Sequence, residues 1–168
     1  NGYVVEWTDS SIMDNQSKVE AINKSQAIIE FNLDGSIITA NENFLKTLGY
    51  RLDEIKGKHH SMFVDSSYRD SADYQKFWND LRAGQFQAGK YKRLAKGGRE
   101  VWIEASYNPV IDLNGRPFKV VKFATDITGT VDQLRDIKQE MVNYLAKIED
   151  SVSVVNQQTE AASSASTQ

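Results

Sequence analysis

Hydrophobic and β-branched residues gather in five segments of the chain, each bounded by turn-forming residues. Two segments lie in the first quarter and are joined by Asp34-Gly35, a dipeptide typical of tight hairpin turns. The other three lie in the second half, where Asn114-Gly115 joins the last two. The predicted strands are residues 27–33, 36–40, 85–95, 99–111 and 117–127. Two groups of hairpin-linked strands predict an antiparallel sheet.

Between the two strand groups, hydrophobic residues recur at intervals of three and four, which is typical of helices. Asn41 is a favourable N-cap for a helix that Gly49 ends. Ser71 can cap a second helix over residues 71–83. The apolar face of this second helix holds Tyr74, Phe77, Trp78 and Leu81. Together with the strands, these helices predict an α+β domain, a five-stranded antiparallel sheet with short helices on one face.

The first 26 residues have a pattern of their own. A strand-like run ends in Thr8-Asp9 and is similar to the later run that ends in Thr125-Asp126. This partial repeat predicts that residues 1–11 are the last strand of a preceding, similar domain. Residues 12–26 place Ile12, Val19 and Ile22 on one helical face and predict a linker helix.

From residue 129 onward the hydrophobic period becomes seven. The repeating positions are Leu134, Met141, Ile148 and Val155. Ile137, Tyr144, Leu145 and Val152 fill the companion positions, and charged residues lie mostly outside them. Three heptads of this kind predict a coiled coil, so we expect residues 129–168 to form a long helix that makes a homodimer through residues 130–156.

Composition narrows the function classes. The 168 residues include 40% hydrophobic residues and 10% aromatic residues, which is enough to fill one domain core. A net charge of −3 without a Lys/Arg cluster argues against nucleic-acid binding. The absence of cysteine excludes disulfides and thiol chemistry. No apolar run approaches the roughly 18 residues of a membrane span, so we expect a soluble, cytoplasmic segment.

Short motifs at the turns and helix ends point to a family. They are Asp34-Gly35, Ala40-Asn41, Leu48-Gly49-Tyr50, Gly57-Lys58, Lys96-Gly97-Gly98, Trp102, Pro109, Asn114-Gly115 and Asp126-Ile127-Thr128. Each is common by itself, but in this order they resemble the PAS sensor family over about residues 24–128. The resemblance implies the PAS fold for residues 27–128, with a ligand pocket between the helices and the inner face of the sheet.

The arrangement as a whole looks like PAS domains of bacterial methyl-accepting chemotaxis receptors, with the final residues similar to the start of their signalling helix. That resemblance implies a sensory module that converts a ligand, redox or oxygen input into a change in a dimeric helix. It also implies that the parent protein acts on a chemotaxis kinase and adaptor complex. The alternatives are the input domain of a histidine kinase or cyclic-dinucleotide enzyme, and a cofactor-free dimerisation module.

The resemblance places twelve side chains around the pocket. They are Ile29, Phe31, Phe44, Leu48, Met62, Phe63, Phe77, Trp78, Trp102, Tyr107, Val121 and Phe123. Most of these side chains are equally well explained as the ordinary core of a domain of about 105 residues. We therefore take His59, His60, Phe77, Trp78, Trp102 and Phe123 as the candidate cofactor-binding residues.

Two cofactors are compatible with the resemblance. Some chemoreceptor-type PAS domains bind haem through a histidine of a short helix, the place where His59 or His60 falls. Aerotaxis PAS domains that bind FAD share Trp78 and Trp102 with this chain, but their Asn before the strand Arg is Lys92 here. An amide is suited to the flavin edge and a lysine is not, so FAD is the weaker candidate. A module with an unknown small-molecule ligand, or with none, is the remaining alternative.

The segment Asp126-Ile127-Thr128 ends the last predicted strand directly before the heptads. We therefore expect Asp126 and Thr128 to couple the sheet to the helix. An enzymatic reading would pair His59 or His60 with a nearby aspartate, but no nucleophile, phosphate-loop or metal-ligand spacing accompanies them. We expect no catalytic activity and no metal site.

Overall fold

The computed structural model describes the backbone of residues 2–166 and the side chains of residues 10–166. Five antiparallel strands form one sheet in the order β2-β1-β5-β4-β3. The strands are β1 (Ala27–Asn32), β2 (Ile37–Ala40), β3 (Gln87–Leu94), β4 (Glu100–Ile111) and β5 (Pro117–Asp126). The five strands predicted from the sequence are thus confirmed, with ends that differ by no more than two residues.

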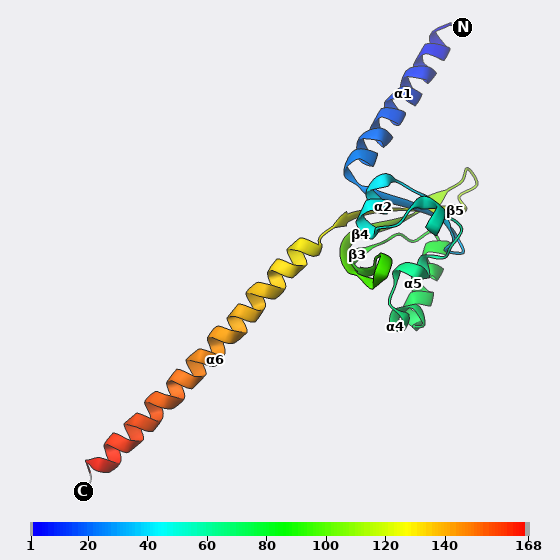
Figure 1. Ribbon diagram of the computed structural model, residues 1–168. Helices are drawn as coiled ribbons and strands as arrows, with labels where there is room; N and C mark the ends of the chain where they lie inside the picture. Colours follow the sequence, from blue (N-terminus) through cyan, green and yellow to red (C-terminus); the bar gives the residue numbers. More distant parts are fainter. Residues whose placement is uncertain (1, 167–168) are drawn as a thin grey trace. The chain divides into compact units, whose positions relative to one another are not determined.

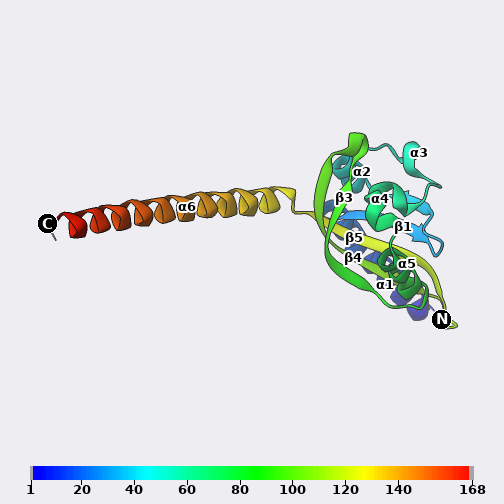
Figure 2. The ribbon, with the colours of Figure 1, turned by 90° about the horizontal axis from the view of Figure 1, so that it is seen from below.

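Short helices connect β2 to β3 and lie against one face of the sheet (Figures 1 and 2). They are α2 (Glu42–Leu48), α3 (Leu52–Ile55), η1 (His60–Phe63), α4 (Ser66–Arg69) and α5 (Ala72–Arg82). A further turn of 3-10 helix, η2 (Lys96–Gly98), joins β3 to β4. The expected α+β architecture, with helices on one face of a five-stranded sheet, is confirmed.

Alternate residues of the central strands face the helices, because side chains of a strand point to opposite faces of the sheet. On β4 the buried positions are Val101, Ile103, Ala105 and Tyr107. On β5 they are Val120, Lys122 and Ala124. The helix-facing side of the sheet therefore contains a lysine at the centre of its core.

This alternation corrects three of the predicted pocket residues. Val121 and Phe123 of β5 and Trp102 of β4 have the opposite parity to the buried residues, so they lie on the outer face of the sheet. The prediction failed because β5 carries apolar residues at both parities, so its sequence alone does not show which parity is buried. Its pairing opposite Tyr107 and Ile29 instead fixes Lys122 on the inner face.

Asn41 ties together the first strand and the first short helix. Its Oδ1 accepts hydrogen bonds from the amides of Ile28 (2.9 Å) and Phe44 (3.0 Å), and the second of these caps α2. Its Nδ2 donates to the Gln26 carbonyl at 2.8 Å. Gly49 ends the same helix at φ +74°, a left-handed conformation that glycine adopts without strain.

The N-terminal segment differs from the expectation. Helix α1 spans Gly2–Ser25, so residues 2–11 are helical and the strand expected over residues 1–11 is wrong where the structure describes it. A helix satisfies its own backbone hydrogen bonds, whereas a strand here would need a partner strand. Residues 12–25 are helical as predicted. That the segment belongs to a preceding similar domain stays a prediction.

The C-terminal segment is one long helix, α6 (Thr128–Ala165). The described residues from 129 onward form a unit separate from the described residues up to 128. Its heptad residues are exposed in the single chain: Leu134, Met141 and Ile148 each show more than half of their surface. None of the described helices is long and apolar enough to cross a membrane.

We expect Asn41→Ala to lower the free energy of unfolding by about 2 kcal/mol, since it removes the α2 cap and leaves the Ile28 amide unpaired. Urea unfolding followed by circular dichroism measures the change. Asn41→Asp keeps both acceptor contacts and should recover most of the loss. Equal destabilisation by the two variants would contradict this role of the Asn41 oxygen.

Candidate functional site

His60 is held in the middle of the domain by backbone contacts with the first hairpin. Its amide donates to the Gly35 carbonyl at 2.8 Å, and His59 forms an isolated antiparallel bridge with Ser36. The His60 side chain has no exposed surface. The hairpin turn predicted at Asp34-Gly35 therefore positions the imidazole as well as joining two strands.

A hydrogen-bonded chain crosses the core through this imidazole. His60 Nδ1 lies 2.9 Å from the Tyr74 hydroxyl of α5, and Nε2 lies 3.1 Å from the Tyr107 hydroxyl of β4. Arg93 of β3 donates from its guanidinium to the same Tyr107 oxygen at 3.0 Å. Since Arg93 occupies a lone pair of that oxygen, its hydrogen is free to point to His60 Nε2. This arrangement favours the tautomer with the proton on Nδ1.

Burial keeps the imidazole neutral. It lowers the pKa of His60 well below the ordinary value, and the nearby positive charges of Arg93 and Lys122 lower it further. Burial also raises the pKa of Tyr107, and it raises that of Tyr74 to about 12. Near neutral pH the side chains of Tyr74, His60 and Tyr107 are therefore uncharged, and Arg93 is the basic group at the end of this hydrogen-bonded chain.

Lys122 lies beside this chain without a polar partner. Its Nζ is buried and makes no hydrogen bond among the described residues. It lies 4.9 Å from the centroid of the Tyr107 ring and 5.5 Å from that of Phe44. Burial, followed by the charge of Arg93, lowers the pKa of Lys122 well below its ordinary value.

Aromatic rings enclose the imidazole on several sides. The His60 ring centroid lies 6.2 Å from that of Phe77 and 5.5 Å from that of Trp78. Phe77 in turn packs edge-on against Tyr107, with centroids 4.9 Å apart. The structure thus brings together three of the candidate residues: His60, Phe77 and Trp78.

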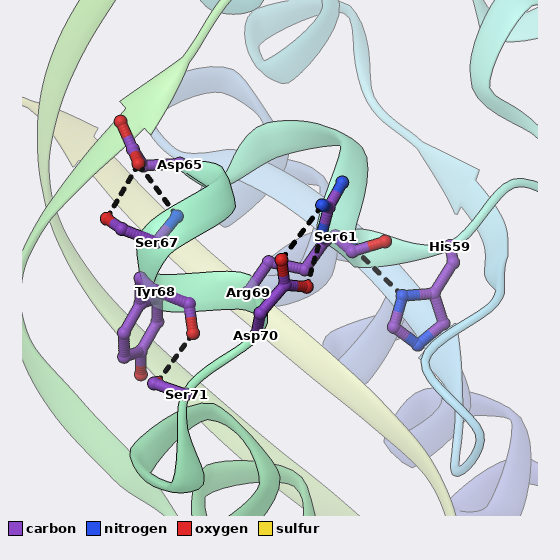
Figure 3. Close-up of polar contacts among 8 residues, drawn as sticks. All are labelled: His59, Ser61, Asp65, Ser67, Tyr68, Arg69, Asp70 and Ser71. Carbon is purple, nitrogen blue, oxygen red and sulfur yellow. Dashed lines mark hydrogen bonds and ion pairs between the residues drawn. The ribbon is translucent and has the colours of Figure 1, made fainter.

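His59 belongs to the edge of the site. Its Nδ1 accepts from the Ser61 amide at 3.1 Å and caps η1 (Figure 3). Its Nε2 lies 2.8 Å from the Asp34 carbonyl. Its ring is 6.0 Å from that of Trp78. It borders a surface cleft of about 340 Å³ lined by Asp34, His59, Tyr74, Gln75, Trp78, Asn79 and Arg82.

The segment between His59 and α5 is organised by local polar contacts (Figure 3). Asp65 caps α4 by accepting from the Ser67 amide at 3.0 Å and its hydroxyl at 2.8 Å. The Ser71 hydroxyl donates to the Tyr68 carbonyl at 2.6 Å and caps α5. These local hydrogen bonds shape the turns of this segment, while Phe63 and Val64 of the same segment are buried in the core.

Haem does not fit the packed histidines. Both ring nitrogens of His60 are engaged by tyrosine hydroxyls, and both of His59 by backbone groups. Neither imidazole therefore offers a free nitrogen to iron. Within residues 10–166 there is also no group of three or more side chains suited to holding a metal ion.

The candidate flavin contacts are divided between the two faces of the sheet. Trp78 lies on the helix side, whereas Trp102 and Phe123 lie on the outer face. Lys92 also has outer-face parity on β3, where its ammonium is 3.1 Å from Glu100. These residues do not converge on one ring system, so the structure does not support them as a flavin site.

Asp126 and Thr128 do meet where β5 ends. The Asp126 carboxylate accepts from the Thr128 amide at 2.9 Å and from its hydroxyl at 2.6 Å. The Thr128 oxygen accepts from the Trp102 amide of β4 at 3.0 Å. The Ile127 amide donates to the Trp102 carbonyl at 2.8 Å. The first residue of α6 is thus fastened to the start of β4 by its side chain.

The sequence reasoning missed the basic half of the site. Arg93 and Lys122 were not among the candidates, although both are buried in the structure. The available signal was the position of Lys122 within the run Val120-Val121-Lys122-Phe123-Ala124, where a charge interrupts an apolar central strand. Tyr107 was predicted to line the pocket and Tyr74 to lie on the apolar face of its helix, but the contacts of their hydroxyls depend on the tertiary structure.

We expect the free energy of unfolding to fall by about 1.4 kcal/mol between pH 7.5 and pH 5.5 because of His60. The unfolded imidazole takes up a proton near pH 6.5, whereas the folded one has a lowered pKa and stays neutral. Its contribution to stability is therefore full above pH 6.5 and is lost as the pH falls. Urea unfolding at both pH values measures this difference.

His60→Gln should reduce the pH dependence by this His60 contribution of about 1.4 kcal/mol, and His59→Gln serves as the matched control that keeps it; Lys122, whose pKa burial also lowers, contributes to the dependence in both variants. An unchanged dependence in His60→Gln would show that another group is responsible. Carboxylates with lowered pKa values, such as Asp34 and Asp65, titrate at lower pH and do not interfere in this window.

Comparison with known proteins gives matches of three kinds. The family model described as "PAS domain" matches residues 25–129. The chain is 43% identical over 128 residues to the biofilm dispersion protein BdlA of Pseudomonas aeruginosa, covering 76% of this chain and 30% of that protein. It is 30% identical over 80 residues to the aerotaxis receptor of Escherichia coli, covering 48% of this chain and 16% of that protein.

Among solved structures, the PAS domain of a protein from Colwellia psychrerythraea superposes with a TM-score of 0.59 at 21% identity. The match covers 68% of this chain and 97% of that domain, and it shows the shared fold. The chain spans less than a third of the length of the two curated relatives. The matched family model and the 43% identity over three quarters of the chain show that this chain belongs to the PAS domain family.

Proposed function

We propose that this chain is the sensory module of a chemotaxis receptor, which converts a ligand, redox or oxygen input into a change in a dimeric signalling helix. The module acts without catalysis, and its parent acts on a chemotaxis kinase and adaptor complex in the cytoplasm. Membership of the PAS family supports the sensory role. The similarity to a protein named as an aerotaxis receptor supports the chemotaxis setting.

One observation supports the coupling step most strongly: the buried site and the start of α6 share the same two strands. Lys122 pairs with Tyr107 in the β4–β5 ladder, and the same two strands end at the contact between Thr128 and Trp102. Only the paired strands β4 and β5 lie between Tyr107 and this contact. Paired strands move as a unit, so the input can reach the helix without a loop between them.

The hydrogen bonds of Thr128 make a suitable switching point. Its oxygen accepts from the Trp102 amide and its hydroxyl donates to Asp126, so all three groups depend on one side-chain rotamer. A small displacement of either strand end exchanges or breaks these bonds. Elements with two discrete arrangements can amplify shifts of this size.

The output of the proposed switch is a dimer of α6. The heptad side chains are exposed in the single chain, and their charged neighbours lie outside the repeating positions. A helix with an uncovered apolar stripe in heptad spacing is stabilised by pairing with a second copy. We therefore propose a homodimer through residues 130–156.

Asp126→Ala tests the coupling. In the full-length receptor, we expect this variant to leave kinase activity unresponsive to stimulus, because Thr128 loses its anchor. The 168-residue chain should unfold within about 1 kcal/mol of wild type, since the lost contacts are exposed. Asp132→Ala, which removes an exposed carboxylate of α6, is the control that should respond normally. A normal response of Asp126→Ala would show that the signal takes another route.

Ile148→Lys tests the dimer. A lysine in the apolar stripe should raise the dimer dissociation constant at least about tenfold, because its charge would be buried at the interface. Sedimentation equilibrium of the 168-residue chain measures the constant. Glu149→Lys introduces the same side chain one position away, outside the repeating positions, and should leave the dimer intact. Equal weakening by both variants would contradict the proposed interface.

A further inference from the structure

The buried ionisable side chains at the centre of this domain are all basic. The buried polar and charged side chains of the described residues are His60, Arg93 and Lys122, and all three are basic. Neither Arg93 nor Lys122 takes part in any ion pair in the part of the chain that the structure describes. An unpaired cation is strongly unfavourable in a protein core, and this is why burial lowers the pKa of Lys122; a negative charge beside it would favour its protonated form.

Hydrogen-bond donors are also in excess at the same place. Lys122 Nζ and Arg93 Nε are both buried and have no acceptor among the described residues. The two side chains meet on Tyr107: Arg93 donates to its hydroxyl at 3.0 Å, and Lys122 Nζ lies 4.9 Å from its ring centroid. Buried donors normally have partners, so two unused ones around a single tyrosine indicate a missing acceptor.

We propose that this cluster is the binding site for a small organic acid, whose carboxylate pairs with Lys122 and Arg93 beside Tyr107. The inference rests on the proposed sensory function and names the chemical class of its ligand. A carboxylate supplies the negative charge and the two acceptor oxygens that the core lacks.

The surroundings favour an organic acid over an inorganic anion. Lys122 Nζ lies 5.5 Å from the ring centroid of Phe44 and 4.9 Å from that of Tyr107, and the Phe77 ring packs against Tyr107. These faces suit a short apolar body attached to the charged group, and they give inorganic phosphate no further donors. A binding site with apolar walls and a few converging polar groups is typical of small-molecule recognition.

Arg93 also connects the cluster to the surface. It lines a cleft of about 350 Å³ together with Asp65, Ser67, Tyr68, Lys90, Tyr91, Lys92 and Trp102. Its guanidinium carbon lies 4.7 Å from the Tyr91 ring centroid, at the boundary between this cleft and the core. A ligand in this cleft would contact Arg93, which donates to the Tyr107 hydroxyl beside Lys122.

The site has a direct connection to the proposed output. Lys122 lies on β5 four residues before Asp126, and its cross-strand neighbour Tyr107 lies on β4, the strand that holds Trp102. A carboxylate bound to Lys122 and Arg93 beside Tyr107 would change the packing of β4 and β5 at the same time. The ligand and the Thr128 contact would thus act on the same pair of strands.

Thermal unfolding of the 168-residue chain tests the proposal with sodium acetate, propionate and succinate. The matched uncharged probes are acetamide, propionamide and succinamide, with sodium chloride holding the ionic strength constant. We expect at least one acid to raise the midpoint saturably, by about 5 °C at roughly ten times its Kd, and its amide to have no effect. No saturable rise with any of the acids, or an equal rise with the amides or with sodium phosphate, would overturn the proposal.

Lys122→Met provides the site-specific control. This variant should unfold at a higher temperature than wild type without ligand, since it loses an unpaired buried amine, and should lose the response to the acid. Lys119→Met, on the same strand with opposite parity, should keep the response. A response that persists in Lys122→Met would place binding elsewhere. Because this experiment measures binding alone, its outcome is independent of whether Asp126→Ala uncouples signalling.

Discussion

The interior of this domain depends on one shared oxygen, the hydroxyl of Tyr107. It lies 3.1 Å from His60 Nε2 and accepts from Arg93 at 3.0 Å, so it joins η1, β3 and β4. Through His60 the same chain reaches Tyr74 of α5 at 2.9 Å. A buried polar network of this kind stabilises one arrangement of the elements only while every member is paired. The site is therefore sensitive to any group that competes for Tyr107.

The network also links the layer of helices to the sheet on which it packs. The helices pack on the inner sheet face through the aromatic rings of Phe77 and Trp78, while the polar chain passes between those rings. Apolar packing sets the positions of the elements, and the hydrogen bonds set which side chains meet. Lys122 adds a buried amine that has no hydrogen-bond partner among the described residues. Lys122 and Tyr107 lie on β5 and β4, and the contacts of Thr128 are made at the ends of the same two strands. The buried site and the start of α6 are therefore connected through one pair of strands.

Much of the fold could be predicted because it rests on local chemistry. Asp34-Gly35 makes the first turn, Asn41 caps the first helix, and hydrophobic segments bounded by turn-forming residues mark all five strands. The junction of Asp126 with Thr128 was also visible, because both residues lie within one short motif. The N-terminal strand was predicted from its similarity to a later segment, without a strand with which it could pair. Without a partner, those residues are helical.

The site was predicted only in part, and the reason is the parity of β5. His60, Phe77 and Trp78 follow from helical spacing and from the scarcity of histidine in the chain. Which face of β5 is buried depends on its register with β1 and β4, far away in the sequence. That register turned Lys122 inward and Phe123 outward. The sequence by itself determined the elements, their order and the junction of Asp126 with Thr128, since these depend on neighbouring residues. Only the tertiary structure decided which basic side chains share the core, because pairing between distant strands selects the buried face.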